Sequence, residues 1–117
     1  VVVDAGSGYS PFAEEVWSRC DVLIHVCADE PASKRKTEKW IQEWDEWSSQ
    51  EAIRGKSVYV VNKCLKELRS GGFSWEEQAV RLPYVPEWKQ DGDVVDPVFQ
   101  QRMHQLAEEV WDRCGRP

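Results

Sequence analysis

The chain has 117 residues, of which 41% are hydrophobic and 31% are charged. These proportions exclude a disordered segment and predict one globular domain. The formal net charge of −6 argues against nonspecific nucleic-acid binding, which requires a basic surface. No apolar run approaches the ~18–20 residues of a membrane-spanning helix, so no transmembrane segment is predicted.

The chain opens with an apolar, β-branched run that ends in an aspartate. The continuous character of Val1–Asp4 is typical of a buried parallel strand, and the small residues Ala5–Gly8 follow it as a turn. Because open parallel sheets bind ligands at the carboxyl ends of their strands, Asp4 is a candidate site residue. The predicted strand begins at residue 1, so we expect the chain to be a fragment of a larger domain.

Proline-bearing caps predict where two helices begin. Ser10 and Pro11 are expected to cap and start a short helix over Phe12–Arg19. Asp96 and Pro97 are expected to do the same for the last helix. The apolar stripe of that last helix consists of Phe99, Met103, Leu106 and Val110.

A long helix is predicted from an N-cap at Ser33 to about Gln50. Its apolar face carries three tryptophans at spacings of four and three, namely Trp40, Trp44 and Trp47. This stripe either packs on the sheet or forms an exposed aromatic face for a protein partner. The start of the helix carries four basic residues, Lys34, Arg35, Lys36 and Lys39. They form either a solvated helix face or a patch for an anionic partner.

Three further apolar runs alternate with the helices and predict the strands Val22–Cys27, Ser57–Asn62 and Arg81–Val85. The first two are expected to be buried, whereas Pro83 limits the hydrogen-bond ladder of the third. This order predicts an α/β fold with an open parallel sheet of about four strands and flanking helices. We expect Val1–Asp4 to pair directly with Val22–Cys27. The alternative is a second copy of the chain that fills this sheet edge and makes a dimer.

The cysteines and histidines give no metal-binding or catalytic pattern. The cysteines are widely spaced and lack a C-x-x-C motif, at Cys20, Cys27, Cys64 and Cys114. We therefore expect free thiols in a cytoplasmic protein and no metal site among them. His25 lies inside an apolar strand, which predicts a hydrogen-bonded core residue rather than a catalyst. No catalytic residue is assigned.

Four motifs occur in order along the chain: Val1–Gly8, Cys20–Pro31, Val58–Lys63 and Leu82–Glu87. They are similar, respectively, to a Walker B or switch II element, an aspartate–strand–acidic-proline run, a strand ending in a base-contacting asparagine, and a proline loop beside the nucleotide. Together they resemble the later half of a MinD/ParA-type ATPase, a P-loop NTPase with a deviant phosphate-binding lysine motif. The pilus-assembly and septum-site branches are the most similar in character.

The resemblance implies a three-layer, P-loop NTPase-like half domain with a nucleotide site. Asp4 would hold magnesium through its water shell, and Gly8 would lie in the nucleotide-sensing switch. Asn62 would contact adenine, and Pro86 would line the base pocket. The chain lacks the family's glycine-lysine phosphate loop, so ATP and Mg²⁺ are expected only if an upstream segment supplies one. The chain alone is not expected to hydrolyse ATP.

Two other functions stay open. A non-catalytic interaction module with the same fold would use the tryptophan-bearing helix or the basic patch to bind a protein partner or a second copy. A receiver-like signalling domain also alternates strands and helices, but it needs an aspartate where the strand Ser57–Asn62 ends in asparagine.

Overall fold

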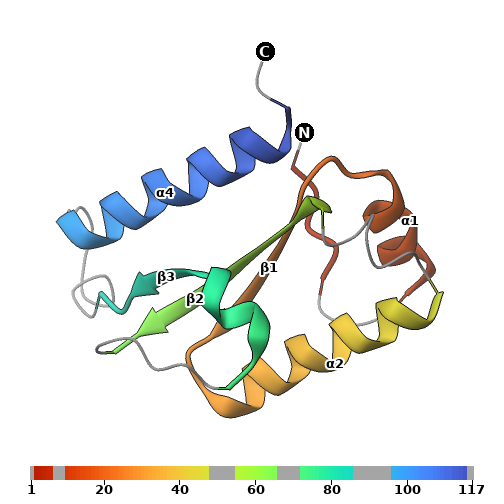
Figure 1. Ribbon diagram of the computed structural model, residues 1–117, viewed down its shortest axis with the longest axis horizontal. Coiled ribbons are helices and arrows are strands. Elements are labelled where there is room, and N and C mark those ends of the chain that lie inside the picture. Colours follow the sequence, from red (N-terminus) through yellow and green to blue (C-terminus); the bar gives the residue numbers. More distant parts are fainter. Residues whose placement is uncertain (1, 7–9, 48–54, 66–71, 86–95, 116–117) are drawn as a thin grey trace.

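The computed structural model describes residues 2–6, 10–47, 55–65, 72–85 and 96–115, with the side chains of residues 44–47 left aside. These residues form an α/β fold with an open three-stranded parallel sheet and three α-helices (Figure 1). The strands are β1 (Leu23–Ala28), β2 (Ser57–Cys64) and β3 (Val80–Pro83). The helical segments are α1 (Pro11–Arg19), α2 (Pro31–Trp47), the 3-10 turn η1 (Ser74–Gln78) and α4 (Pro97–Arg113).

The sheet has the order β1-β2-β3, and both strand pairs are parallel, as predicted. The β1–β2 ladder runs from Leu23 opposite Ser57 to Ala28 opposite Asn62. The crossover between β1 and β2 contains α2, and the one between β2 and β3 contains η1. Parallel neighbours require such crossovers, because a tight hairpin can join only antiparallel strands.

The predicted first strand is wrong for the part of it that the structure describes. Residues 2–4 form no strand, and the side chains of Val2 and Val3 are 99% and 50% exposed. The direct pairing with β1 is therefore wrong as well for residues 2–4, and the described residues form a sheet of three strands instead of about four. Three apolar residues make few ladder bonds. A strand gains most of its stability from the partner strand and the core that it joins, and among the described residues 2–4 have neither.

The capped helix starts are confirmed. The Ser10 hydroxyl accepts a hydrogen bond from the Ala13 amide at 3.0 Å, and the Asp96 carboxylate accepts one from the Phe99 amide at 2.8 Å. In both helices a proline follows the cap residue. At the far end of α4, Gly115 adopts φ +74°, a left-handed conformation that glycine tolerates best.

The long helix starts earlier than predicted. It begins at Pro31, so Ser33 is not its N-cap. The Ser33 hydroxyl instead accepts a hydrogen bond from the amide of Ala28, the last residue of β1, at 3.0 Å. The serine therefore fastens the first turn of α2 to the end of the strand.

Helices cover both faces of the sheet. On one face, Cys27, Val61, Cys64 and Trp75 form a buried cluster with Ile41 of α2 packed against it. On the other face, Phe99 and Leu106 of α4 pack against a second buried cluster that consists of Val60, Val80 and Leu82. The apolar stripe predicted for α4 is thus partly confirmed, but Met103 is 41% exposed.

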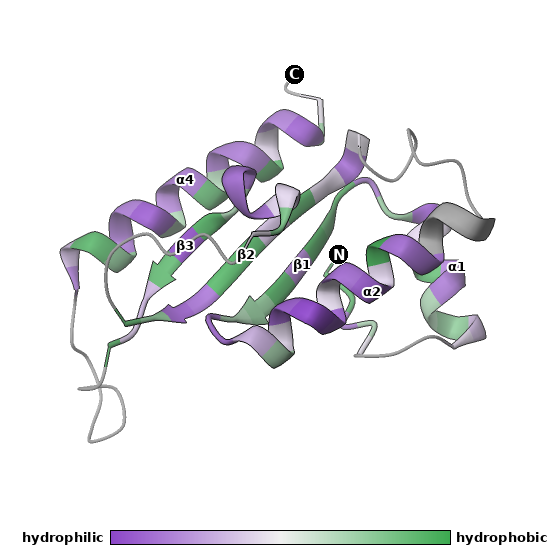
Figure 2. Cartoon of the chain, turned by 60° about the horizontal axis from the view of Figure 1, so that its bottom comes forward, coloured by the Kyte–Doolittle hydropathy of each residue, from purple (hydrophilic) through white to green (hydrophobic). Residues whose placement is uncertain are grey.

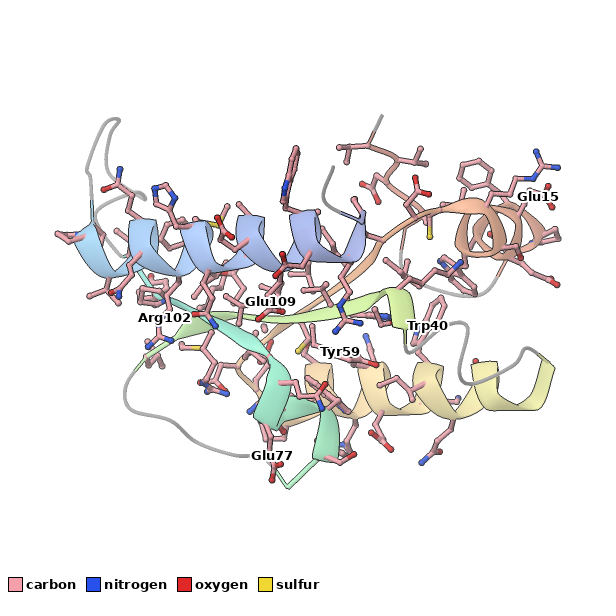
Figure 3. The ribbon with its side chains drawn as sticks, turned by 45° about the horizontal axis from the view of Figure 1, so that its top comes forward. Glu15, Trp40, Tyr59, Glu77, Arg102 and Glu109 are labelled. Atoms are coloured by element: carbon pink, nitrogen blue, oxygen red, sulfur yellow. The ribbon has the colours of Figure 1, made fainter. Side chains whose placement is uncertain are left out.

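The tryptophan of α2 that the structure describes is packed, not exposed to a partner. Trp40 points from α2 toward α1, where its ring meets Trp17 edge-on at a centroid distance of 4.6 Å (Figure 3). Both belong to a cluster around Ala13 and Leu23 that joins the two helices to the start of β1. The side chains of Trp44 and Trp47 lie outside the described residues.

Burial of β1 is one-sided, contrary to the prediction that the whole strand is buried. Ile24 and Val26 are 44% and 62% exposed, whereas Cys27 is buried. The reason is the position of α4, which lies along β3 and does not extend over β1 (Figure 1). Of the helices in the described part of the chain, none is long and apolar enough to cross a membrane.

Candidate functional site

The carboxyl ends of the three strands meet at one edge of the sheet, where open α/β sheets bind ligands. Two backbone hydrogen bonds join β2 to the segments that follow β1 and β3 at this edge. The Asp29 amide donates to the Asn62 carbonyl, and the Tyr84 amide donates to the Cys64 carbonyl, both at 2.9 Å. Residues from β1, β2 and β3 are therefore held side by side at this edge.

Four buried charges lie behind the edge and form one ion network. Lys34 Nζ is 2.8 Å from Asp29 Oδ1 and 3.0 Å from Glu76 Oε2. Arg81 Nη2 is 3.2 Å from Asp29 Oδ2. The four side chains are between 1% and 12% exposed, and they come from the end of β1, from α2, from η1 and from β3.

The two cations and two carboxylates of this network stabilise one another in the charged state. Burial alone would raise the pKa of Asp29, but Lys34 and Arg81 outweigh burial and hold this pKa below its usual value. Burial would lower the pKa of Lys34, but Asp29 and Glu76 outweigh it and raise that pKa. The network is therefore suited to fixing the ends of the strands in place.

Asn62 and Lys63 lie at the same edge in an unusual backbone conformation. Lys63 has φ 58°, the left-handed region, which costs a non-glycine residue about 1 kcal/mol. The Asn62 side-chain oxygen accepts a hydrogen bond from the Lys63 amide at 2.8 Å and supports this turn. Among the described residues, nothing accepts a hydrogen bond from the side-chain Nδ2 atom of Asn62.

The structure does not bring Asp4 and Asn62 together. The Asp4 carboxylate accepts a hydrogen bond from the Gly6 amide at 2.9 Å, and its neighbour Ala5 packs against the cluster at the start of β1. Asn62 lies near the opposite end of the sheet. The assignment of Asp4 to a magnesium site stays a prediction, and the strand on which that assignment depended is not formed. Gly8 and Pro86 lie outside the described residues.

His25 forms a side-chain hydrogen bond, as predicted, but it is partly buried and not a fully buried core residue. Its Nε2 atom is 3.1 Å from the Ser57 hydroxyl, and its ring stacks on Tyr59 at a centroid distance of 4.8 Å. Burial lowers the pKa of His25 to about 4, so the imidazole is neutral at physiological pH.

The four cysteines are free thiols, at Cys20, Cys27, Cys64 and Cys114. Burial raises the pKa of the Cys27 and Cys64 thiols, which makes them less reactive. Within the part of the chain that the structure describes, no group of three or more potential ligands is placed to hold a metal ion.

The sequence did not predict the ion network. Lys34 was assigned to a basic helix face, but it is 4% exposed, whereas its neighbours Arg35 and Lys36 are exposed. One signal was present in the sequence, since Arg81 interrupts an apolar strand at a position where burial is expected. Its partners Asp29 and Glu76 could not be identified from spacing, because they come from two other elements, the end of β1 and η1.

A polar cavity of about 460 Å³ lies at the other end of β2. Its lining includes Ser57 and Tyr59 of β2, Glu77 of η1 and Glu109 of α4, three of which are labelled in Figure 3. The residues of the ion network and Asn62 take no part in this lining. The cavity is therefore separate from the carboxyl edge, the edge of the sheet at which the three strands end.

No protein-family model matches the chain, and no curated protein and no solved structure was found to match it.

Proposed function

We propose that the chain is the later part of a MinD/ParA-like nucleotide-binding domain and that its carboxyl edge contributes contacts to the base of a nucleotide. The observation that carries this proposal is the position of Asn62. It lies near the carboxyl end of β2, the central strand of the parallel sheet, at the edge where such sheets bind ligands. The resemblance of the motifs in the sequence assigns the same residue to adenine.

The residues at this edge fit a base better than they fit phosphates. A carboxamide offers a donor and an acceptor, the pair that recognises the edge of an adenine ring. The described residues offer no loop of backbone amides with a lysine that could hold phosphates, and the cations Lys34 and Arg81 are bound to carboxylates. ATP and Mg²⁺ would therefore require a phosphate-binding segment upstream, where bound magnesium would neutralise phosphate charge.

Titration of the chain with adenosine and with Mg²⁺–ATP, followed by NMR, tests the proposal. We expect both ligands to shift the signals around Asn62 with similar millimolar dissociation constants, about −4 kcal/mol, because the phosphates make no contact. Asn62→Ala should abolish these shifts, whereas Gln100→Ala, which removes an exposed amide on α4, should not. Micromolar binding of Mg²⁺–ATP, or shifts that persist in Asn62→Ala, would contradict the proposal.

A second candidate function is a non-catalytic interaction module. The specific observation in its favour is the exposure of Ile24 and Val26 on β1. Contiguous exposed apolar surface marks interaction sites on many proteins.

A further inference from the structure

Lys63 has a backbone conformation that residues other than glycine rarely adopt, and backbone hydrogen bonds hold the chain on both sides of it. Its φ of 58° lies in the part of β2 where the register against β3 shifts. Before it, the Asn62 carbonyl accepts a hydrogen bond from the Asp29 amide at 2.9 Å. After it, the Cys64 carbonyl accepts one from the Tyr84 amide, also at 2.9 Å. A strained residue persists only where its surroundings fix it, and such residues cluster at functional sites.

The buried ion network joins the two segments that donate these hydrogen bonds. Asp29 directly follows β1, and Tyr84 directly follows β3, the strand that contains Arg81. Arg81 Nη2 is 3.2 Å from Asp29 Oδ2, so one ion pair connects the two segments. Lys34 Nζ, 2.8 Å from Asp29 Oδ1 and 3.0 Å from Glu76 Oε2, adds α2 and η1 to the same network. Figure 2 shows these segments beside one another around the ends of the strands.

We propose that the ion network positions the turn at Asn62 and Lys63, and that Arg81 and Lys34 are positioning residues for the carboxyl edge. They act through Asp29, whose amide holds the Asn62 carbonyl, and not by contact with a ligand. The part of this inference that concerns base affinity rests on the proposed function, because it takes Asn62 as the contact to the base. The part that concerns the turn itself does not.

Loss of one cation should loosen the turn selectively. In Arg81→Gln, Asp29 and Glu76 share Lys34 alone, and the network keeps a buried negative charge in excess. The segment at Asp29 then moves more readily toward water, and its amide separates more often from the Asn62 carbonyl. Arg81→Lys keeps the charge, so it should restore most of the wild-type behaviour.

Amide hydrogen exchange followed by NMR tests the turn without any ligand. In Arg81→Gln, we expect the protection of the Asp29 amide to fall by about tenfold relative to amides in the middle of the β1–β2 ladder. Asp29→Asn, which keeps the size of the side chain, is a second variant and should give the same selective loss at residue 29. Arg81→Lys should stay within about threefold of the wild-type ratio.

Ala13→Gly is the matched control for a general loss of stability. Ala13 is 0% exposed and belongs to the cluster at the start of β1, so this change weakens the fold away from the network. It should leave the protection of the Asp29 amide relative to the ladder unchanged. Equal loss of protection at Asp29 and in the ladder in both Arg81→Gln and Asp29→Asn would overturn the proposal, because the network would then stabilise the fold without positioning the turn.

Titration with adenosine connects the turn to the proposed function. Arg81→Gln should weaken adenosine binding by about tenfold, whereas Arg81→Lys and Ala13→Gly should not. A selective loss of protection at Asp29 with unchanged adenosine affinity would overturn the positioning role in base binding. A wild-type chain that does not bind adenosine contradicts the proposed function alone, and the exchange measurement then decides whether the network holds the turn.

Discussion

The two faces of β1 differ sharply although one short strand supplies both. On the α2 side, His25 stacks on Tyr59 and Cys27 is buried in a cluster with Val61. On the α4 side, Ile24 and Val26 are 44% and 62% exposed. All of these residues except His25 are apolar, so hydropathy does not explain the difference. What differs is the helix layer that packs on each face of the strand. An apolar pattern in the sequence thus indicates that a surface is to be covered, but it does not specify which element covers it.

The largest expected effect concerns the ion network beneath the covered face. Lys34→Met should lower the free energy of unfolding by about 3–5 kcal/mol, because it leaves two buried carboxylates with one cation. Urea unfolding measures this loss. Lys36→Met, which changes an exposed residue of the same helix, should stay within about 0.5 kcal/mol of the wild type.

The same pair of variants gives a pH test of the network. The pKa of Asp29 is lowered from 3.8 and that of Lys34 is raised from 10.5, so the ion pair between Asp29 and Lys34 is charged throughout the range between these values. The difference between Lys34→Met and the wild type should therefore persist across this range and shrink outside it. A difference that disappears near neutral pH would show that the network does not stabilise the fold.

His25 should make the covered face sensitive to acid. An unfolded imidazole binds a proton near pH 6.5, whereas the folded one does so only near pH 4. Between these values the unfolded state holds more protons, so stability should fall as the pH falls, by up to about 3 kcal/mol. Stability curves at several pH values measure this slope. In His25→Gln the part of the slope due to this residue should be absent, and an unchanged slope would assign the effect to other groups.

The smallest expected changes in stability come from truncating one valine on each face of the sheet. This pair of variants compares the two faces most directly. Val61→Ala, at a side chain that is 0% exposed, should cost about 2 kcal/mol through lost burial and a small cavity. Val26→Ala, at a side chain that is 62% exposed, should cost less than about 0.5 kcal/mol in the monomer. Equal costs would mean that the α4 side of β1 is covered in solution, and measurements at several protein concentrations would show whether a second copy covers it.

Local signals in the sequence predicted much of the fold. Ser10–Pro11 and Asp96–Pro97 located two helix starts correctly, because capping depends on a few adjacent residues. The apolar runs around β1 and β2 predicted the two longest strands to within two residues at each end. The alternation of strands and helices then predicted the parallel sheet.

Features that depend on distant parts of the chain were predicted poorly. Val1–Asp4 has a strand-like composition, but a strand forms only beside a partner, and composition does not reveal whether a partner is present. The ion network joins Asp29, Lys34, Glu76 and Arg81, whose positions in the sequence give no sign that they meet. Of the candidate site residues, the structure places Asn62 at the expected edge of the sheet and Asp4 near the other end.

The parallel sheet also has a consequence for how the chain folds. Leu23 must find Ser57, and Val60 must find Val80, before either strand pair forms. Each encounter closes a long loop, and the entropy of closure is lost before the ladder compensates for it. The helices α1, α2 and α4 depend on local contacts and can form early. Folding should therefore be limited by the search of β2 for its two neighbours, and until they are found the apolar strands stay exposed to pairing with other molecules.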